Sequence, residues 1–223
     1  RYSYAASFGK KSICAEEARL IKKELARFRK ISVREESGRD ILKRELNRES
    51  SVNLDPTLLL EKRIWEKLCL KNSYKKPYLL VYAVNTTEKL FAEAEKLSEQ
   101  LNLKVVFIGQ AVKKKIQHPK FKFVSDAGPL EFITLFANAS YVLTSSFHGT
   151  AMSLIFERKF TSLLNRNNEK SDRIVSLLKM LSLDDRIKWE NEDCVISEYT
   201  VEWEKVKSEL ERYRKEAFSY LSE

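Results

Sequence analysis

The chain has little glycine, proline, cysteine or histidine. Its 223 residues include 5 Gly, 4 Pro, 3 Cys and 2 His. The three cysteines, Cys14, Cys69 and Cys194, are odd in number and far apart. They therefore favour neither a disulfide framework nor a zinc-type cluster, and they fit a reducing compartment. We expect free thiols and no metal site.

Long apolar runs are missing as well. The longest uninterrupted one, residues 78–84, is far too short to span a bilayer. No charged-then-apolar leader opens the chain, so we expect a cytoplasmic protein. Because Arg1 leads directly into strand-like residues, we also expect further sequence upstream.

Positive charge is in excess. Lys and Arg number 41 against 32 Asp and Glu, a formal net charge of +9. This balance favours an anionic partner such as a phosphorylated small molecule, a lipid surface or nucleic acid, although a solvated lysine-rich surface explains it equally well. The run Lys113–Lys115 has no interleaved aromatic residues, so we expect no nucleic acid. Peripheral contact with the anionic inner face of a membrane stays open.

Apolar runs of strand length alternate with helical periodicity along most of the chain. Such βα alternation predicts parallel sheets wrapped by helices. The pattern restarts after Pro77, so we predict two lobes. The predicted domains are the carboxyl-side part of a first lobe at 1–60, a helix and linker at 61–77, and a second lobe at 78–223. A final helix near 197–220 has one apolar stripe, which favours docking within the chain over a coiled-coil partner.

The most informative segment is 141–156, YVLTSSFHGTAMSLIF. An apolar strand turns directly into an apolar helix there, and the first N–H groups of such a helix attract anions. The turn also carries His148, the side chain best suited to move protons near neutral pH. We predict that His148 is catalytic. The alternative is a histidine that only caps or packs.

Four small residues surround this histidine. Ser145, Ser146 and Thr150 can donate hydrogen bonds to phosphate or carboxylate oxygens, although N-capping is the commoner use of such residues. Gly149 would allow a ligand to approach the backbone closely. We predict that all four bind substrate, because ligands of open parallel sheets lie beyond the carboxyl ends of the strands.

Two arginines are further candidates. Arg34 lies at the end of a predicted strand beside two glutamates, so a surface ion pair is the competing interpretation. Arg173 lies in the first turn of a predicted helix, where positive charge opposes the helix dipole. That misfit suggests an anionic partner, although Asp172 beside it offsets the cost.

Residues 139–156, with the SFHG motif, resemble the best-marked segment of the polysaccharide pyruvyl transferase family. The segments YAASFG, ISVRE, DPTLL and SDRI resemble its other blocks, at residues 4–9, 31–35, 55–59 and 171–174. The resemblance covers nearly the whole chain. It implies a GT-B-like α/β fold of two Rossmann-like lobes with parallel sheets, the first lobe incomplete at its amino-terminal side.

The resemblance also implies a ketal-forming transferase. Phosphoenolpyruvate would donate its three-carbon unit to a sugar diol of a surface-polysaccharide or cell-wall precursor, with no metal or other cofactor. His148 would bind the donor or act as acid and base, Arg34 would clamp phosphate or carboxylate, and Arg173 would be a further basic position. Some family members have Arg-x-His where this chain has Ser146-Phe147-His148. Two alternatives remain: a GT-B glycosyltransferase using a sugar nucleotide, and a non-catalytic module that binds an anion or glycan.

Overall fold

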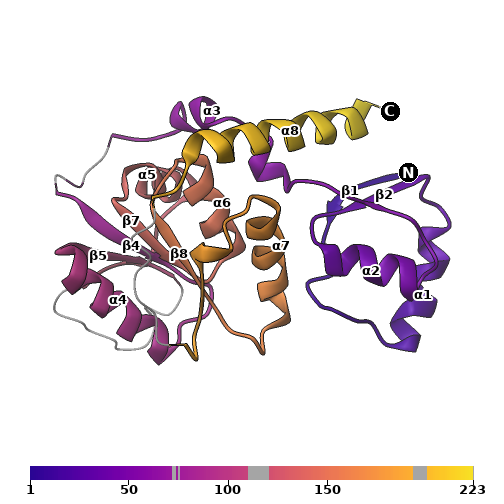
Figure 1. The fold of residues 1–223 in the computed structure, drawn as a ribbon, viewed down its shortest axis with the longest axis horizontal. Coiled ribbons are helices and arrows are strands. Elements are labelled where there is room, and N and C mark those ends of the chain that lie inside the picture. The colour runs from indigo at the N-terminus through magenta and orange to yellow at the C-terminus, as the bar shows by residue number, and fades with distance from the viewer. Residues whose placement is uncertain (72–73, 75, 110–120, 193–199, 223) are drawn as a thin grey trace. The chain divides into compact units, whose positions relative to one another are not determined.

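A computed structural model shows the chain as two α/β units, each with a parallel sheet (Figure 1). Unit 1 comprises Arg1–Leu59, Asn167–Leu183 and Glu202–Glu223, and unit 2 comprises Leu60–Arg166 and Asp184–Val201. Cys194 and the run Lys113–Lys115 lie outside the residues that the structure describes. The described residues are 1–71, 74, 76–109, 121–192 and 200–222.

Unit 2 is built on six parallel strands in the order β6-β5-β4-β7-β8-β9. In chain order, β4 is the first of these strands and β7 the fourth, so the sheet grows outward in both directions from the β4–β7 pair. This is the doubly wound arrangement. The strands are β4 (Tyr78–Tyr82), β5 (Lys104–Ile108), β6 (Phe121–Val124), β7 (Tyr141–Thr144), β8 (Phe160–Leu164) and β9 (Ile187–Trp189).

Helices cover both faces of this sheet (Figure 1). On one face lies α4 (Glu88–Leu101), and on the other lie α5 (Pro129–Asn138) and α6 (Phe147–Ile155). Local sequence sets their ends: the Thr87 hydroxyl accepts from the Leu90 N–H at the start of α4, and Pro129 occupies the first turn of α5. A short helix, α3 (Lys62–Glu66), packs against α5.

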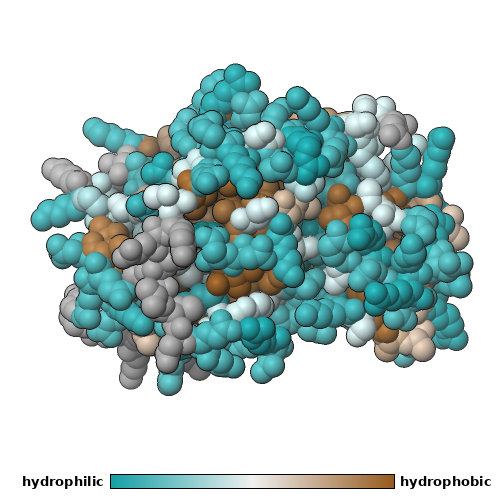
Figure 2. All heavy atoms as spheres, viewed as in Figure 1, coloured by the Kyte–Doolittle hydropathy of each residue, from teal (hydrophilic) through white to brown (hydrophobic). Residues whose placement is uncertain are grey.

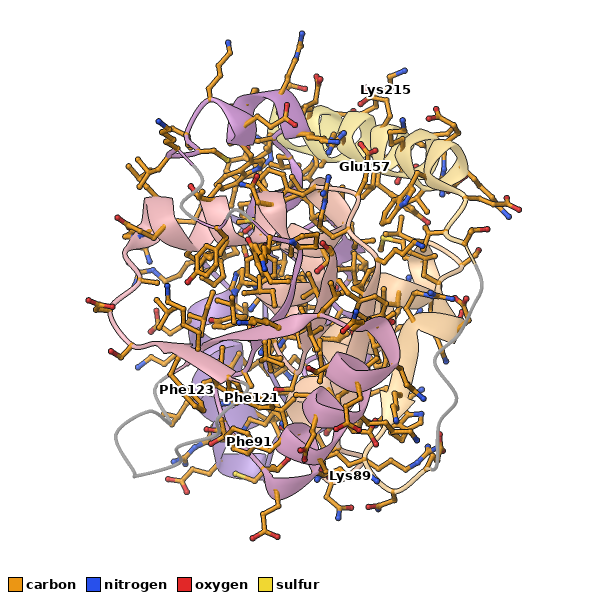
Figure 3. All side chains as sticks on the ribbon, turned by 90° about the vertical axis from the view of Figure 1, so that its left-hand side faces the viewer. Lys89, Phe91, Phe121, Phe123, Glu157 and Lys215 are labelled. Carbon is orange, nitrogen blue, oxygen red and sulfur yellow. The ribbon has the colours of Figure 1, made fainter. Side chains whose placement is uncertain are left out.

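The central strands β4 and β7 of unit 2 are buried on both faces, as expected for a parallel sheet covered by helices. Leu79 and Val81 of β4 pack in the core cluster beneath α4, while Tyr82 packs its ring against Phe132 of α5. Phe91, Phe121 and Phe123 converge at the α4 side of the sheet (Figure 3). Outside the core, hydrophilic side chains dominate the face drawn in Figure 2.

Unit 1 has a smaller sheet in the order β1-β2-β3, also parallel. Its core is formed by residues such as Val33, Ile41 and Leu42, each at most 2 % exposed. Its strands are β1 (Tyr2–Ala6), β2 (Lys30–Val33) and β3 (Ser51–Val52), and its helices are α1 (Ala15–Leu25), α2 (Glu36–Arg44), α7 (Asp172–Met180) and α8 (Trp203–Ser222). Short 3-10 helices occur at η1 (Pro56–Leu58) and η3 (Glu169–Ser171).

The two units divide the chain differently from the predicted domains. The sequence pattern assigned residues 78–223 to the second lobe, but α7 and α8 group with unit 1. Side chains on α8 explain part of this: Arg214 Nε donates to the Leu58 carbonyl at 2.8 Å, and Tyr220 Oη donates to the Ser3 carbonyl at 2.7 Å. The position of a C-terminal helix in the sequence does not show which unit it packs against.

The strand-to-helix segment predicted at 141–156 is confirmed: β7 ends at Thr144 and α6 begins at Phe147. The short strand β9 was missed, because three residues are too few to show a pattern. Part of the predicted final helix, residues 197–199, lies outside the described residues, and α8 begins at Trp203. The α/β class with parallel sheets is confirmed. The expectation that strands precede Arg1 stays a prediction.

Candidate functional site

The segment between β7 and α6 follows a strand at the centre of the sheet in unit 2. We call residues Ser145–Thr150 the β7–α6 turn. Strand β7 pairs with β4, and Tyr82 lies opposite Thr144 in the register. Because the order of the sheet reverses between these two strands, their carboxyl ends form the switch point where open α/β sheets bind ligands. The β7–α6 turn therefore begins at the favoured binding position of this sheet.

Hydrogen bonds to β4 hold the start of the turn. The Thr144 hydroxyl donates to the Tyr82 carbonyl at 2.7 Å and accepts from the Ser146 N–H at 3.1 Å. The Ser145 N–H donates to the same Tyr82 carbonyl at 3.3 Å. Thr144 thus ties the two strand ends together, which fixes where the first turn of α6 begins.

His148 is exposed on the first turn of α6. Its imidazole meets the Phe147 ring edge to face, with 5.6 Å between ring centroids. Ser145 is half-buried and Ser146, the N-cap residue, is buried. The Ser146 side chain makes no capping hydrogen bond to this helix. The turn therefore presents an imidazole to solvent at the positive end of a helix dipole.

Gly149 and Thr150 face the protein interior. A Cβ on Gly149 would lie 2.1 Å from Thr144 Oγ1 and 3.0 Å from Tyr82 Cδ1, so only glycine fits. Thr150 is fully buried, and its hydroxyl lies 2.9 Å from that of Ser162 on β8. Both residues therefore pack α6 on the sheet. That they also bind substrate stays a prediction.

The second group of predicted residues belongs to unit 1. Arg34 follows β2, and its Nη1 donates to Asp55 Oδ2. Asp55 is nearly fully buried, and its other oxygen accepts from the Thr57 N–H at 2.9 Å, which caps η1. Burial by itself works to raise the pKa of Asp55, but the hydrogen bonds from Thr57 and Arg34 outweigh it and the pKa is lowered. Asp55 therefore holds the Arg34 guanidinium as a carboxylate.

Glu35 adds a second buried carboxylate beside Arg34. Its Oε2 lies 3.8 Å from Arg34 Nε, and its Oε1 accepts from the Phe8 N–H at 2.9 Å. The loop after β1 is shaped by Gly9, whose φ of +65° suits glycine. Glu35 thus anchors the end of β1 to the start of α2, where it is the N-cap residue.

Arg173 joins this group from α7. Burial lowers the pKa of Arg173, and the nearby positive charge of Arg34 lowers it further, while Glu35 and Asp55 oppose the shift. Two guanidinium groups and two carboxylates therefore share one partly buried region of unit 1. We call Arg34, Glu35, Asp55 and Arg173 the charge cluster.

A groove of about 770 Å³ lies beside this cluster in unit 1. The Glu36 N–H at the start of α2 donates to Ser176 Oγ of α7 at 3.1 Å, so the two helices meet there. Acidic, basic and apolar side chains together line the groove. It is lined by Lys11, Glu36, Ser37, Arg39, Asp40, Arg44, Val52, Asp172, Val175, Ser176, Lys179, Met180 and Tyr213.

The seven predicted site residues thus fall into two clusters, one in each unit. The sequence prediction missed Glu35, Asp55 and Thr144, which position the residues around them. Asp55 before Pro56 had a detectable signal, because an acidic residue preceding Pro is a typical helix cap. The ion pair between Asp55 and Arg34 joins residues 21 positions apart and had none.

Among the described residues, no three His, Cys, Asp or Glu side chains gather as a metal site. None of the described helices combines the length and the apolar character needed to cross a bilayer.

Comparison with known proteins gives one family. The sequence model of the polysaccharide pyruvyl transferase family matches residues 1–168 of the chain. No curated protein matches it.

Solved structures resemble the chain in fold at low identity. UDP-N-acetylglucosamine 2-epimerase from Rickettsia bellii has a TM-score of 0.51 and 14 % identity, covering 99 % of this chain and 68 % of that one. The Methanocaldococcus jannaschii UDP-GlcNAc 2-epimerase, in complex with UDP-GlcNAc and UDP, has a TM-score of 0.44 and 16 % identity, over 83 % of this chain and 60 % of that one. The wall teichoic acid polymerase TagF has a TM-score of 0.45 and 10 % identity, over 98 % and 59 %.

The first of these likenesses establishes fold only. The fold of the R. bellii epimerase agrees with the α/β class predicted from sequence. The chain spans about 60 % of the length of the M. jannaschii epimerase.

Proposed function

We propose that this chain, which belongs to the polysaccharide pyruvyl transferase family, transfers the three-carbon unit of phosphoenolpyruvate to two hydroxyls of one sugar. The acceptor would be a precursor of a surface polysaccharide or of the cell wall. The observation that carries the proposal is the exposed imidazole of His148 on the first turn of α6, at the switch point of a parallel sheet. No metal or organic cofactor enters the proposed reaction.

The reaction sets clear chemical demands. Two C–O bonds form between the sugar oxygens and C2 of the donor, and the bond from C2 to the phosphate oxygen breaks. One hydroxyl proton ends on the donor methylene, which becomes a methyl group, and the other leaves with phosphate. A general acid must therefore stand near the methylene carbon, and donors of hydrogen bonds must hold the phosphate and carboxylate.

His148 is our candidate for proton transfer. It can exchange a proton near neutral pH, and its exposure leaves it accessible to a small anionic molecule. The N-terminal end of α6 favours negative charge at the same place. Ser145, half-buried at the start of the turn, and Ser146 are the candidate hydroxyl donors. Gly149 and Thr150 support this arrangement by packing α6 against β7 and β8.

Arg34 and Arg173 are our candidates for binding the donor's negative charge. Both are already near Glu35 and Asp55, so the charge cluster is formally neutral. Asp55 fixes the orientation of the Arg34 fork, and a fixed guanidinium matches the planar geometry of a carboxylate. We therefore assign these arginines to orientation of the ligand more than to long-range attraction.

The groove between α2 and α7 is our candidate for the acceptor. Carboxylates, cations and a tyrosine ring together offer hydrogen-bond partners for hydroxyls and an apolar surface for a sugar ring. Exposed Lys179 lines it from α7. We expect Lys179→Ala to raise the acceptor KM and to leave donor binding unchanged, measured by phosphate release and by a donor thermal shift. An unchanged acceptor KM would place the acceptor elsewhere.

The donor is tested by thermal shift. Phosphoenolpyruvate should raise the melting temperature of the protein, and His148→Ala should remove that rise. Because His148 is exposed, this variant should unfold like the original chain in the absence of ligand. Glu88→Ala, an exposed change on the first turn of α4, is the matched control and should keep the rise.

Turnover is tested on the protein with phosphoenolpyruvate and a panel of free and lipid-linked sugars, following phosphate release. A rise in melting temperature with uridine or cytidine nucleotides, and none with phosphoenolpyruvate, would favour the glycosyltransferase. Binding with no turnover of any donor would favour the non-catalytic module.

A further inference from the structure

Five large apolar side chains are exposed together on unit 2. Each of them is between 38 and 43 % exposed. Four come from the segment around α3 and one from the first turn of α5. We call this set the α3 surface: Leu60, Ile64, Leu68, Leu70 and Leu130.

Hydrogen bonds hold the two parts of the α3 surface together. The Leu70 N–H donates to Thr134 Oγ1 of α5 at 2.8 Å, and the same hydroxyl donates to the Leu130 carbonyl at 2.7 Å. The Leu68 N–H donates to the Trp65 carbonyl at 3.0 Å, which continues the turn after α3. Leu70 is therefore tied to α5 beside Leu130, and α3 itself contacts α5.

Positive charge is interleaved with these apolar residues. The segment 60–71 contains Lys62, Arg63, Lys67 and Lys71 against Glu61 and Glu66. Lys62 pairs with Glu157 at 3.3 Å and Arg63 pairs with Glu61 at 3.0 Å. In the described part of the chain, Lys67 and Lys71 are exposed and form no ion pair. Their charge is available to an external anion.

This combination distinguishes between possible occupants. The buried centre of a protein interface is depleted of lysine, so a second copy or another protein fits poorly where lysines stand among the leucines. A lipid interface suits both residue types, because leucines enter the boundary of the acyl chains while lysines reach the headgroups. The net charge of +9 adds attraction to an anionic surface.

We propose that the α3 surface binds the interface of an anionic lipid bilayer, with Ile64, Leu68 and Leu70 entering it and Lys67 and Lys71 contacting lipid phosphates. The chain would then be held at a membrane without spanning it. This inference is independent of the donor, since it concerns a different surface from the β7–α6 turn.

The test is co-sedimentation with vesicles. The protein should sediment with vesicles of equal parts phosphatidylcholine and phosphatidylglycerol, and much less with phosphatidylcholine alone. Lys67→Gln combined with Lys71→Gln should weaken binding about 30-fold, at about 1 kcal/mol for each lysine near the surface. Leu68→Glu should weaken it as well, and added salt should reduce the binding of the original chain.

Matched changes on α1 of unit 1 distinguish binding at the α3 surface from attraction to the net charge of the whole chain. Lys22→Gln combined with Lys23→Gln removes the same charge, and Leu20→Glu alters a leucine that is even more exposed than Leu68. Both controls should keep nearly full binding. Equal losses in the control and α3 variants would overturn the proposal, as would absence of binding to either vesicle. A chain that is dimeric in solution and becomes monomeric with Leu68→Glu would instead make the α3 surface an interface between copies.

Discussion

The two units position their candidate site residues by opposite physical means. In unit 2, neutral hydrogen bonds and close packing around Thr144, Gly149 and Thr150 hold the β7–α6 turn. In unit 1, buried charges hold one another in the cluster around Arg34 and Asp55. Packing of this kind tolerates little change in volume, whereas a charge cluster tolerates little change in charge.

This difference affects what each site can do. In unit 2, a turn held by uncharged groups presents the exposed imidazole of His148. A cluster of compensated charges fixes the orientation of guanidinium groups but adds little net attraction for an anion.

The largest expected effect comes from breaking the charge cluster. Asp55→Ala removes the buried partner of Arg34, and we expect it to destabilise unit 1 by about 3 kcal/mol, because a partly buried guanidinium loses its carboxylate. Hydrogen exchange of the α2 amides should accelerate while that of α4 does not. The control is Glu192→Ala, which removes the partner of exposed Arg166 and should cost about 0.5 kcal/mol. Equal effects would contradict the distinction between the units.

The second-largest effect is expected from adding a side-chain atom inside the β7–α6 turn. Gly149→Ala places a Cβ against Thr144 and Tyr82, and we expect about 2 kcal/mol of destabilisation in unit 2 from overpacking. Urea unfolding of the variant measures it. Gly9→Ala in unit 1 meets no atom within 4 Å and suffers only from its φ of +65°, at about 1 kcal/mol. A Gly149→Ala variant as stable as the original would mean that α6 can move away from the sheet.

Removal of one buried hydroxyl tests the hydrogen bonds of the same turn. Thr150→Val leaves the fully buried Ser162 hydroxyl without this partner, so we expect a loss of about 1–2 kcal/mol. Ser145→Ala, at a half-buried position of the same turn, should change stability by less than about 0.5 kcal/mol. Circular dichroism melts of the two variants give the comparison.

The pH dependence of the free energy of unfolding tests single ionisable side chains of unit 1. Burial, with the nearby charge of Asp55, raises the pKa of Tyr4 in unit 1 to about 12. The unfolded phenol ionises near its ordinary pKa of about 10, so the contribution of Tyr4 is complete below that pH and is lost between there and pH 12. Tyr4→Phe should flatten this alkaline decline, measured by urea unfolding.

Asp55 affects the acidic side of the same dependence of stability on pH. Its folded pKa is lowered, so its contribution is present above the unfolded value of about 3.9 and disappears as pH falls through the folded pKa. Asp55→Asn should remove this acid dependence from unit 1. An unchanged acid limb would mean that another carboxylate governs it.

The contiguous features of the chain could be predicted from its sequence. Helical and strand periodicity led to the α/β class, and the SFHG turn led to His148 at the start of a helix, where the structure shows it exposed. These features depend on residues next to one another, because the strand, the turn and the first helical residues form one local unit.

Only the tertiary structure decided how distant segments combine. It brought Asp55 to Arg34, returned α8 to unit 1, and turned Gly149 and Thr150 toward the strands that they pack against. The sequence alone determined the class of the fold and the place of the imidazole. Long-range pairing determined which residues of the β7–α6 turn face solvent and which face the core, because contacts between distant residues leave no periodic pattern along the chain.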